Sequence, residues 1–385
     1  MPRSPLHQQI DTLPALVRDM VERLVTEIAA ALPYSLCEKV RRVFVTGCGD
    51  SHHAALNSEL AFEELAGLPC EPMTAMQFGR YAARFLPDTG PRSSLVLAVS
   101  VSGQVSRTAE ALALGRQAGG VAVAVTGNSA GALANEAEVI LPTAVPPLPA
   151  ELQGMIVPGT RSYVASQLTL YLTAVHLGEQ RGHLTHRAAT RLRQALAQMA
   201  ELMEETIARS DPLARQLAAA WLDGREFVFC GAGPNFGTAL FSAAKLIEAA
   251  GDTAVAQDTE EWAHLQYFGK QANTPTFFIS AGGQDTSRVR EVATAAVHIG
   301  RRTAVIGPDS LEMAADTAVA RLPTASLSQE CFSPLLTCLP GTLFAAYRAQ
   351  FLGEPYFRGF GGGRSAAGGG GISRIRDSER VTSSE

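Results

Sequence analysis

An internal duplication constrains the fold of this chain more than any other feature. Residues 227–233 read FVFCGAG and line up with residues 43–49, VFVTGCG, so each copy is a strand followed by a Gly-x-Gly turn. A helix is predicted after each turn, over about 236–250 and about 52–66. The copies lie about 180 residues apart, which is far longer than the period of a solenoid repeat and indicates two domains.

Further strands repeat in the same order after each turn. The apolar stretch 94–99 corresponds to 276–279, and the end of the next apolar stretch, 123–126, corresponds to 304–307. Strands that alternate with helices are typical of parallel sheets with right-handed crossovers, and strands this apolar suit a sheet that is covered on both faces. We therefore predict an α/β protein of two tandem flavodoxin-like or Rossmann-like domains, each a parallel sheet flanked by helices.

The expected domain plan follows from this repeat. A helical segment is predicted at 1–39, a first domain at 40–185, a helical linker at 186–222, a second domain at 223–350 and a Gly-rich tail at 351–385. The tail is either a disordered end or a mobile flap over the site that ends in the charged stretch Arg374–Arg380.

Composition and charge indicate which kinds of partner are disfavoured and in which cell compartment the protein is expected. The formal net charge is −5 and no long basic run is present, which disfavours nucleic acid and anionic membranes as partners. The sequence contains no run of about 18 apolar residues, so no membrane span is predicted. The N-terminus lacks the apolar core of a signal peptide. The six cysteines form no CxxC pair, so we expect buried thiols in a cytoplasmic protein, with no zinc cluster.

Serine-rich turns in the first half suggest an anion site. Ser100–Gly103 forms a Ser-x-Ser-Gly turn at a predicted strand end, and Ser51 follows an earlier strand. Ligands of open parallel sheets bind beyond the carboxyl ends of the strands, where helix N-termini offer free N–H groups. A single serine is better explained as a helix N-cap, and Asp50 would repel a phosphate. The set as a whole still favours ligand binding.

The second half supplies candidate acid–base groups. Lys245 precedes Glu248 by three residues, and His264 follows sixteen positions later. Taken alone, the first two would form an intrahelical ion pair and the histidine would be structural. Moving a proton between C1 and C2 of a sugar needs a base, and opening its ring needs an acid–base group, so a carboxylate with an imidazole suits both tasks.

Two other functional motifs are weaker. The third glycine of a dinucleotide fingerprint is replaced by His52 and by Phe236 in the two copies, which disfavours dinucleotide binding. Residues 127–131 match the GxSxG nucleophile elbow, but a turn or helix cap at Ser129 is the better explanation. A serine hydrolase has no placed histidine and acid to support it.

These motifs together resemble the sugar isomerase (SIS) domain family, over about residues 40–350. The chain looks most like the tandem-domain isomerase half of glucosamine-6-phosphate synthase and the related Amadori-product deglycases of the fructosamine-6-phosphate type. The resemblance implies that Glu248 is the general base, that Lys245 lies one helical turn before it, and that His264 opens the sugar ring. The implied phosphate site consists of Cys48, Gly49, Asp50, Ser51, Ser100, Ser102, Gly103, Gln104 and Ser166. In these relatives the active sites are shared in a homodimer, with the histidine arriving from the partner.

Departures from the family pattern bear on the chemistry. Phe241 stands where the synthase has a glutamate, Asp50 replaces a threonine of the loop, and Val105 replaces another. The chain carries no glutaminase domain and no N-terminal cysteine nucleophile, which argues against glutamine-dependent amination.

We therefore expect an isomerase or a deglycase that acts on a sugar phosphate or an amino-sugar conjugate, works as a homodimer and needs no metal or organic cofactor. The rival expectation is a phosphosugar-binding regulator without catalysis. Such a sensor has no need for Glu248 and His264.

Overall fold

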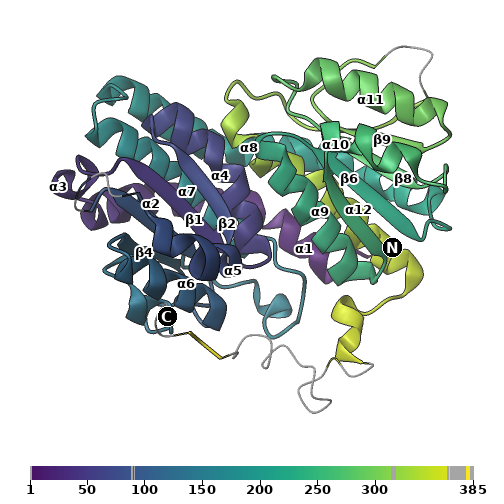
Figure 1. The fold of residues 1–385 in the computed structure, drawn as a ribbon. Coiled ribbons are helices and arrows are strands. Elements are labelled where there is room, and N and C mark those ends of the chain that lie inside the picture. The colour runs from purple at the N-terminus through teal and green to yellow at the C-terminus, as the bar shows by residue number, and fades with distance from the viewer. Residues whose placement is uncertain are drawn as a thin grey trace. The chain divides into compact units, whose positions relative to one another are not determined.

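The computed structural model describes residues 2–87, 90, 92–313, 318–361, 364 and 379–381. The chain forms two compact units. The first domain comprises residues 15–146, 161–198 and 360–385, and the second comprises residues 1–14, 147–160 and 199–359. Figure 1 shows the elements of both.

The first domain is built on a parallel sheet of five strands in the order β2-β1-β3-β4-β5. The strands are β1 (Arg42–Gly47), β2 (Cys70–Thr74), β3 (Ser94–Val99), β4 (Val121–Thr126) and β5 (Val139–Pro142). The three central strands are almost completely buried, as expected for a sheet with helices on both faces.

The second domain repeats this topology strand for strand. Its five strands pair in parallel in the order β7-β6-β8-β9-β10. They are β6 (Glu226–Gly231), β7 (Thr253–Asp258), β8 (Pro275–Ile279), β9 (Arg302–Gly307) and β10 (Ala320–Pro323). The predicted α/β class and the duplication are therefore confirmed.

The α-helices of the described residues connect and cover these strands. They are α1 (Pro5–Asp11), α2 (Leu13–Ala31), α3 (Tyr34–Cys37), α4 (Asp50–Ala66), α5 (Ala75–Gln77), α6 (Ser106–Gln117), α7 (Arg161–Gln180), α8 (His186–Ala220), α9 (Pro234–Ala250), α10 (Thr259–His264), α11 (Thr286–His298) and α12 (Pro334–Leu352). None of them offers a stretch long and apolar enough to span a membrane.

Alternation of side chains along β6 and β8 divides the second core into two layers. Val228 and Phe278 pack toward Trp262 of α10 and the apolar face of α11. Phe227 and Phe277 point the other way, and their rings lie 5.7 and 4.9 Å from that of Phe344 in α12. This period of two is the ordinary geometry of a strand buried on both faces, and it fixes where α9 and α10 can lie.

Of the 35 residues of the Gly-rich tail, 20 lie outside the described residues, so the predicted flap is not placed. Only residues 379–381 of its charged end are described, and they lie against the first domain. The backbone N–H of Val381 donates to Glu110 Oε2 at 3.2 Å, and Arg380 lies 3.5 Å from a carboxylate oxygen of Glu136.

Candidate functional site

The strand order of the first domain brings the two predicted anion loops together. Strands β1 and β3 are neighbours, with Gly47 opposite Val99 at their carboxyl ends. The sheet continues through β2 on one side and β4 on the other, so the switch point of the topology lies between these two strands. Ligand crevices of open α/β sheets form at this point. Residues 48–51 and 100–104 therefore lie next to each other, at the carboxyl ends of β1 and β3.

The backbone of both loops depends on glycine. Gly49 has φ of +56°, and a Cβ added there would meet nothing within 4 Å, so the loop is open on that side. Gly103 has φ of +65°, and a Cβ added there would lie 3.0 Å from Thr126 Oγ1 and 3.2 Å from Asn128 Cβ. L-amino acids with side chains rarely adopt this left-handed conformation.

The predicted phosphate-binding side chains differ in exposure. Cys48, Ser102 and Gln104 are exposed, Ser51 is partly buried, and Ser100 is only 3% exposed. At the start of α4 the backbone N–H groups of Ser51 and His52 donate to the carbonyls of Cys48 and Gly49 at 3.2 and 2.9 Å, and the helix N-terminus carries a partial positive charge that favours an anion.

Ser166 has a partner within its own helix. It is 1% exposed in α7, and its hydroxyl donates to the carbonyl of Ser162 at 2.9 Å. A hydroxyl bonded back to the preceding turn is a common arrangement within helices. A role for Ser166 in phosphate binding therefore stays a prediction.

Two histidines of the first turn of α4 lie beside the loop, and sequence reasoning gave them no role. His53 Nδ1 lies 3.6 Å from Asp50 Oδ1, which is an ion-pair distance rather than a hydrogen bond. Burial, followed by the nearby His53, lowers the pKa of His52 to about 4. The sequence signal was the adjacent pair of histidines directly after the Gly-x-Gly turn.

The second domain holds the predicted base beside a buried cation. Lys245 is 0% exposed, its ammonium group contacts Glu248 Oε2, and its Nζ lies 4.9 Å from the ring centroid of Phe241. Lys245 Nζ also donates to the carbonyl of Gly159 at 3.4 Å. The Glu248 side chain keeps 30% exposure, so part of this side chain reaches solvent while the lysine holds one carboxylate oxygen.

The predicted ring-opening histidine is on the surface of its domain. The His264 side chain is 65% exposed, and its Nε2 lies 3.1 Å from Glu260 Oε1 one helical turn earlier. Asp258 caps the start of this short helix by accepting from the backbone N–H groups of Glu260 and Glu261.

Glu248 and His264 of one chain lie toward opposite ends of the second sheet. Helix α9 begins beside the carboxyl end of β6, and Glu248 is its fifteenth residue, which places it about 20 Å along the helix. His264, in contrast, is in α10, which directly follows the carboxyl end of β7. One domain therefore does not bring the two predicted acid–base groups together.

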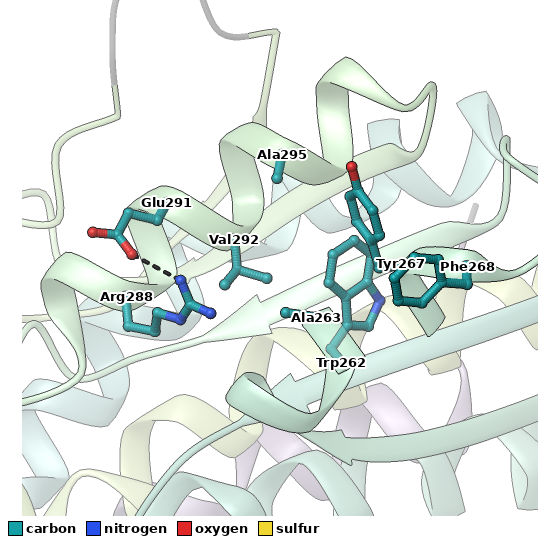
Figure 2. A pocket seen from close by; sticks show the side chains of 8 residues that line it. All are labelled: Trp262, Ala263, Tyr267, Phe268, Arg288, Glu291, Val292 and Ala295. Carbon is teal, nitrogen blue, oxygen red and sulfur yellow. Dashed lines mark hydrogen bonds and ion pairs between the residues drawn. The ribbon is translucent and has the colours of Figure 1, made fainter. Parts of the chain in front are cut away.

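A small pocket of about 260 Å³ opens beside α10. Figure 2 shows its aromatic side, formed by Trp262, Tyr267 and Phe268, and its charged side, where Arg288 is paired with Glu291. Phe268 is 76% exposed although Trp262 is fully buried, so the pocket lies between core and surface.

The anion loop of the first domain has a counterpart in the second, where carboxylates of the same domain contact the loop. Residues 280–284 follow β8 as residues 100–104 follow β3. The Glu330 carboxylate lies so close to Gly283 that a Cβ there would be 2.2 Å from it, and it accepts from the backbone N–H of Gln284 at 3.2 Å. Ser280 Oγ donates to Asp285 at 2.5 Å.

The turn at Ser129 does not have the form of a nucleophile elbow. Ser129 lies in a turn, and only the three-residue 3-10 helix Ala134–Glu136 follows it, so the strand–turn–helix of a nucleophile elbow is not formed. Within the described part of the chain, no three His, Cys, Asp or Glu side chains gather in a way that could hold a metal ion.

Comparison with known proteins agrees with this fold. Residues 36–177 match the SIS domain family model. A glutamine–fructose-6-phosphate aminotransferase of Gloeobacter violaceus is 27% identical over 348 residues, which cover 89% of this chain and 55% of the relative. The chain thus spans about half the length of that curated relative.

Solved structures show the same architecture over nearly the whole chain. The C-terminal domain of glucosamine-fructose-6-phosphate aminotransferase from Francisella tularensis superposes with a TM-score of 0.77 at 17% identity, covering 92% of this chain and 98% of that domain. Glucosamine-6-phosphate deaminase from Thermotoga maritima gives a TM-score of 0.63 at 18% identity, with 91% and 95% covered. Residues 36–177 therefore form a SIS domain, and the second parallel sheet gives the chain a second domain of the same topology.

Proposed function

We propose that this protein is a phosphosugar isomerase or deglycase that moves a proton between C1 and C2 of a sugar phosphate or of its amino-acid conjugate. In this proposal Glu248 is the base. His264 opens the ring or protonates a leaving amine, and the loops at Cys48–Ser51 and Ser100–Gln104 hold the phosphate. The relatives named above are enzymes of amino-sugar phosphates, which favours this substrate class.

The observation that carries the proposal is the contact of the buried Lys245 with the partly exposed Glu248. Burying an ammonium group is costly unless it is paired, so a fully buried lysine fixes the position of the carboxylate it contacts. Glu248 is left partly exposed, as a base that must reach a substrate requires. Nearby positive charge also favours the ionised carboxylate, which is the form that accepts a proton.

The chemistry then needs only groups of this chain. Glu248 would remove the proton from the carbon next to the carbonyl or imine and return it to the neighbouring carbon, through an enediol or enamine. His264 would transfer the proton that opens the ring. Cys48 and Asp50 would border the ligand, and Asp50 is the feature that least suits phosphate, because like charges repel.

The separation of Glu248 from His264 within one domain supports a shared site. We propose a homodimer in which His264 of one copy serves the site that contains Glu248 of the other. The cytoplasmic location stays a prediction from the sequence.

A turnover screen tests the function. Purified protein and Glu248→Gln would be given 6-phosphorylated fructose, glucosamine and fructosyl-amino acids, with unphosphorylated controls, and hexose phosphate and released amine would be measured. Turnover that the variant loses would support an enzyme, and the productive substrate would separate isomerase from deglycase. Saturable binding without turnover would instead favour a phosphosugar sensor, which is the second candidate because the loops alone suffice for it.

A further inference from the structure

We propose that Glu260 is a positioning residue that fixes His264 in the tautomer protonated on Nε2, which leaves Nδ1 as the ring atom that exchanges a proton with the sugar. The inference rests on the proposed function, in which His264 is the ring-opening group. It adds a residue that neither the sequence motifs nor the comparisons assign.

The contact between the two side chains determines which ring nitrogen of His264 bears the hydrogen. His264 Nε2 lies 3.1 Å from Glu260 Oε1, and these residues are one turn apart on α10, where side chains four positions apart meet. An ionised carboxylate can only accept hydrogen bonds, so Nε2 must carry the hydrogen. The other ring nitrogen is then the acceptor in the neutral imidazole.

Arg288 of α11 keeps Glu260 ionised and in place. Its Nε donates to Glu260 Oε2 at 2.5 Å and its Nη2 donates to Glu260 Oε1 at 2.9 Å. This two-bond geometry orients a carboxylate as well as stabilising it. The hydrogen bonds to Arg288, and then that to His264, hold the pKa of Glu260 below its ordinary value.

The guanidinium group is itself held from a second side. Arg288 Nη1 donates to Glu291 Oε2 at 2.9 Å, as Figure 2 shows. The backbone of Glu260 is fixed independently, because its N–H donates to the capping carboxylate of Asp258 at 2.8 Å. A single exposed ion pair would be too weak to orient a ring, but here the carboxylate is restrained at both its backbone and its side chain.

Glu261 offers a matched control. It is the same residue type, adjacent on α10 and also in the first turn, but its side chain has no place in the chain of contacts from Arg288 to His264. A variant at Glu261 changes the local charge by the same amount without touching the imidazole.

The first readout is the tautomer and does not depend on turnover. Full-length parent, Glu260→Ala, Glu260→Gln and Glu261→Gln would be labelled with ¹⁵N-histidine, and ring nitrogens would be observed by long-range ¹H–¹⁵N correlation at pH 9, above the ordinary range of histidine pKa values. A His264→Gln variant assigns the signal among the eight histidines. We expect the Nε2-protonated form in the parent and in Glu261→Gln, and a mixture of tautomers in Glu260→Ala.

The second readout is kinetic, on whichever substrate the parent turns over. We expect kcat of Glu260→Ala to fall about 10- to 100-fold with KM changed less than threefold, which is smaller than the loss from removing an acid–base group itself, about 100- to 10,000-fold. Glu260→Gln, whose amide oxygen can still accept from Nε2, should recover part of the activity, and Glu261→Gln should match the parent.

The outcomes separate the two claims. An unchanged tautomer in Glu260→Ala overturns the positioning role whether or not the enzyme is active, and so does an unchanged kcat. A parent without turnover on any substrate defeats the proposed function, while the tautomer measurement still decides whether Glu260 orients the ring.

Discussion

The two domains share one backbone plan but treat the same loop in opposite ways. Gly49 and Gly233 begin corresponding helices with nearly identical angles, φ and ψ of 56° and −129° against 51° and −130°. The loop 100–104 presents Ser102 and Gln104 to solvent, whereas Glu330 and Asp285 occupy the donors of loop 280–284.

This difference indicates that the two copies of the fold would serve a site through different elements. A carboxylate that already accepts from the second loop leaves no room or charge for an external anion there. In the proposed function the second domain would therefore contribute through its helices, with Glu248 on α9 and His264 on α10, whereas the first would contribute through its strand-end loops. Three of the predictions compare a residue of one domain with its counterpart in the other, and the last compares two loops of the first domain.

The largest effect is expected for the base and its counterpart. Glu248 is the fifteenth residue of α9 and Glu64 the fifteenth of α4, but Ala61 stands in the first domain where Lys245 stands in the second. We expect Glu248→Gln to lower kcat about 1,000-fold, within the range for losing a general base. Glu64→Gln should leave kcat within about twofold. Both kcat values would be measured in steady-state assays. Equal losses of kcat in the two variants would show that Glu248 is not distinguished from Glu64 as the base.

A second test concerns the glycine that ends the first strand of each domain. A Cβ at Gly231 would lie 2.2 Å from the backbone oxygen of Asn235, whereas at Gly47 it would lie 2.7 Å from the side-chain Cβ of Ser51. Overpacking of this kind costs about 1–3 kcal/mol, and more when backbone must move. We expect Gly231→Ala to lower the free energy of unfolding by about 3 kcal/mol and Gly47→Ala by about half as much, as measured by urea denaturation. The reverse order would mean that the backbone around Gly231 yields more easily than the side chain beside Gly47.

Titration of Asp285 distinguishes the two helix starts, because the corresponding residue in the first domain is Val105. Burial, helped by the charge of Glu330, raises the pKa of Asp285 from 3.8 to about 6. Between about pH 4 and 6 the native state binds a proton that the unfolded chain releases, so the free energy of unfolding falls as pH rises through this window. About two pKa units correspond to at most about 3 kcal/mol, and partial exposure reduces this to about 2 kcal/mol.

Asp285→Asn should abolish that pH dependence and stabilise the protein at pH 7, because the amide oxygen can still accept from Ser280. Thermal unfolding recorded from pH 4 to 7 measures both effects. An identical slope in parent and variant would assign the titration to another group.

The sequence predicted the central part of each sheet, because continuous apolar strands and Gly-x-Gly turns are local signals. It did not predict β2, β7 and β10, which lie at or beside sheet edges and are short or only partly buried. Helix α12 was also missed, since Pro340 interrupts its pattern although the helix continues through it. Among the site residues, the pairing of Lys245 with Glu248 follows from helical spacing, whereas the contact of Glu260 with Arg288 joins two helices and has no signal in sequence.

The smallest expected effect separates the anion loop from the neighbouring turn of the same domain. Ser102 and Ser129 are both exposed serines after strand ends, but only Ser102 lies in the proposed phosphate loop. Losing a hydrogen bond to a charged group costs about 1.5 kcal/mol at the lower end of its range, so Ser102→Ala should raise KM for a phosphorylated substrate about tenfold and leave KM for its unphosphorylated analogue unchanged. Ser129→Ala should change neither constant. If Ser129→Ala removed turnover instead, the hydrolase alternative would have to be reconsidered, and the first domain would act through β4 rather than through the switch point between β1 and β3.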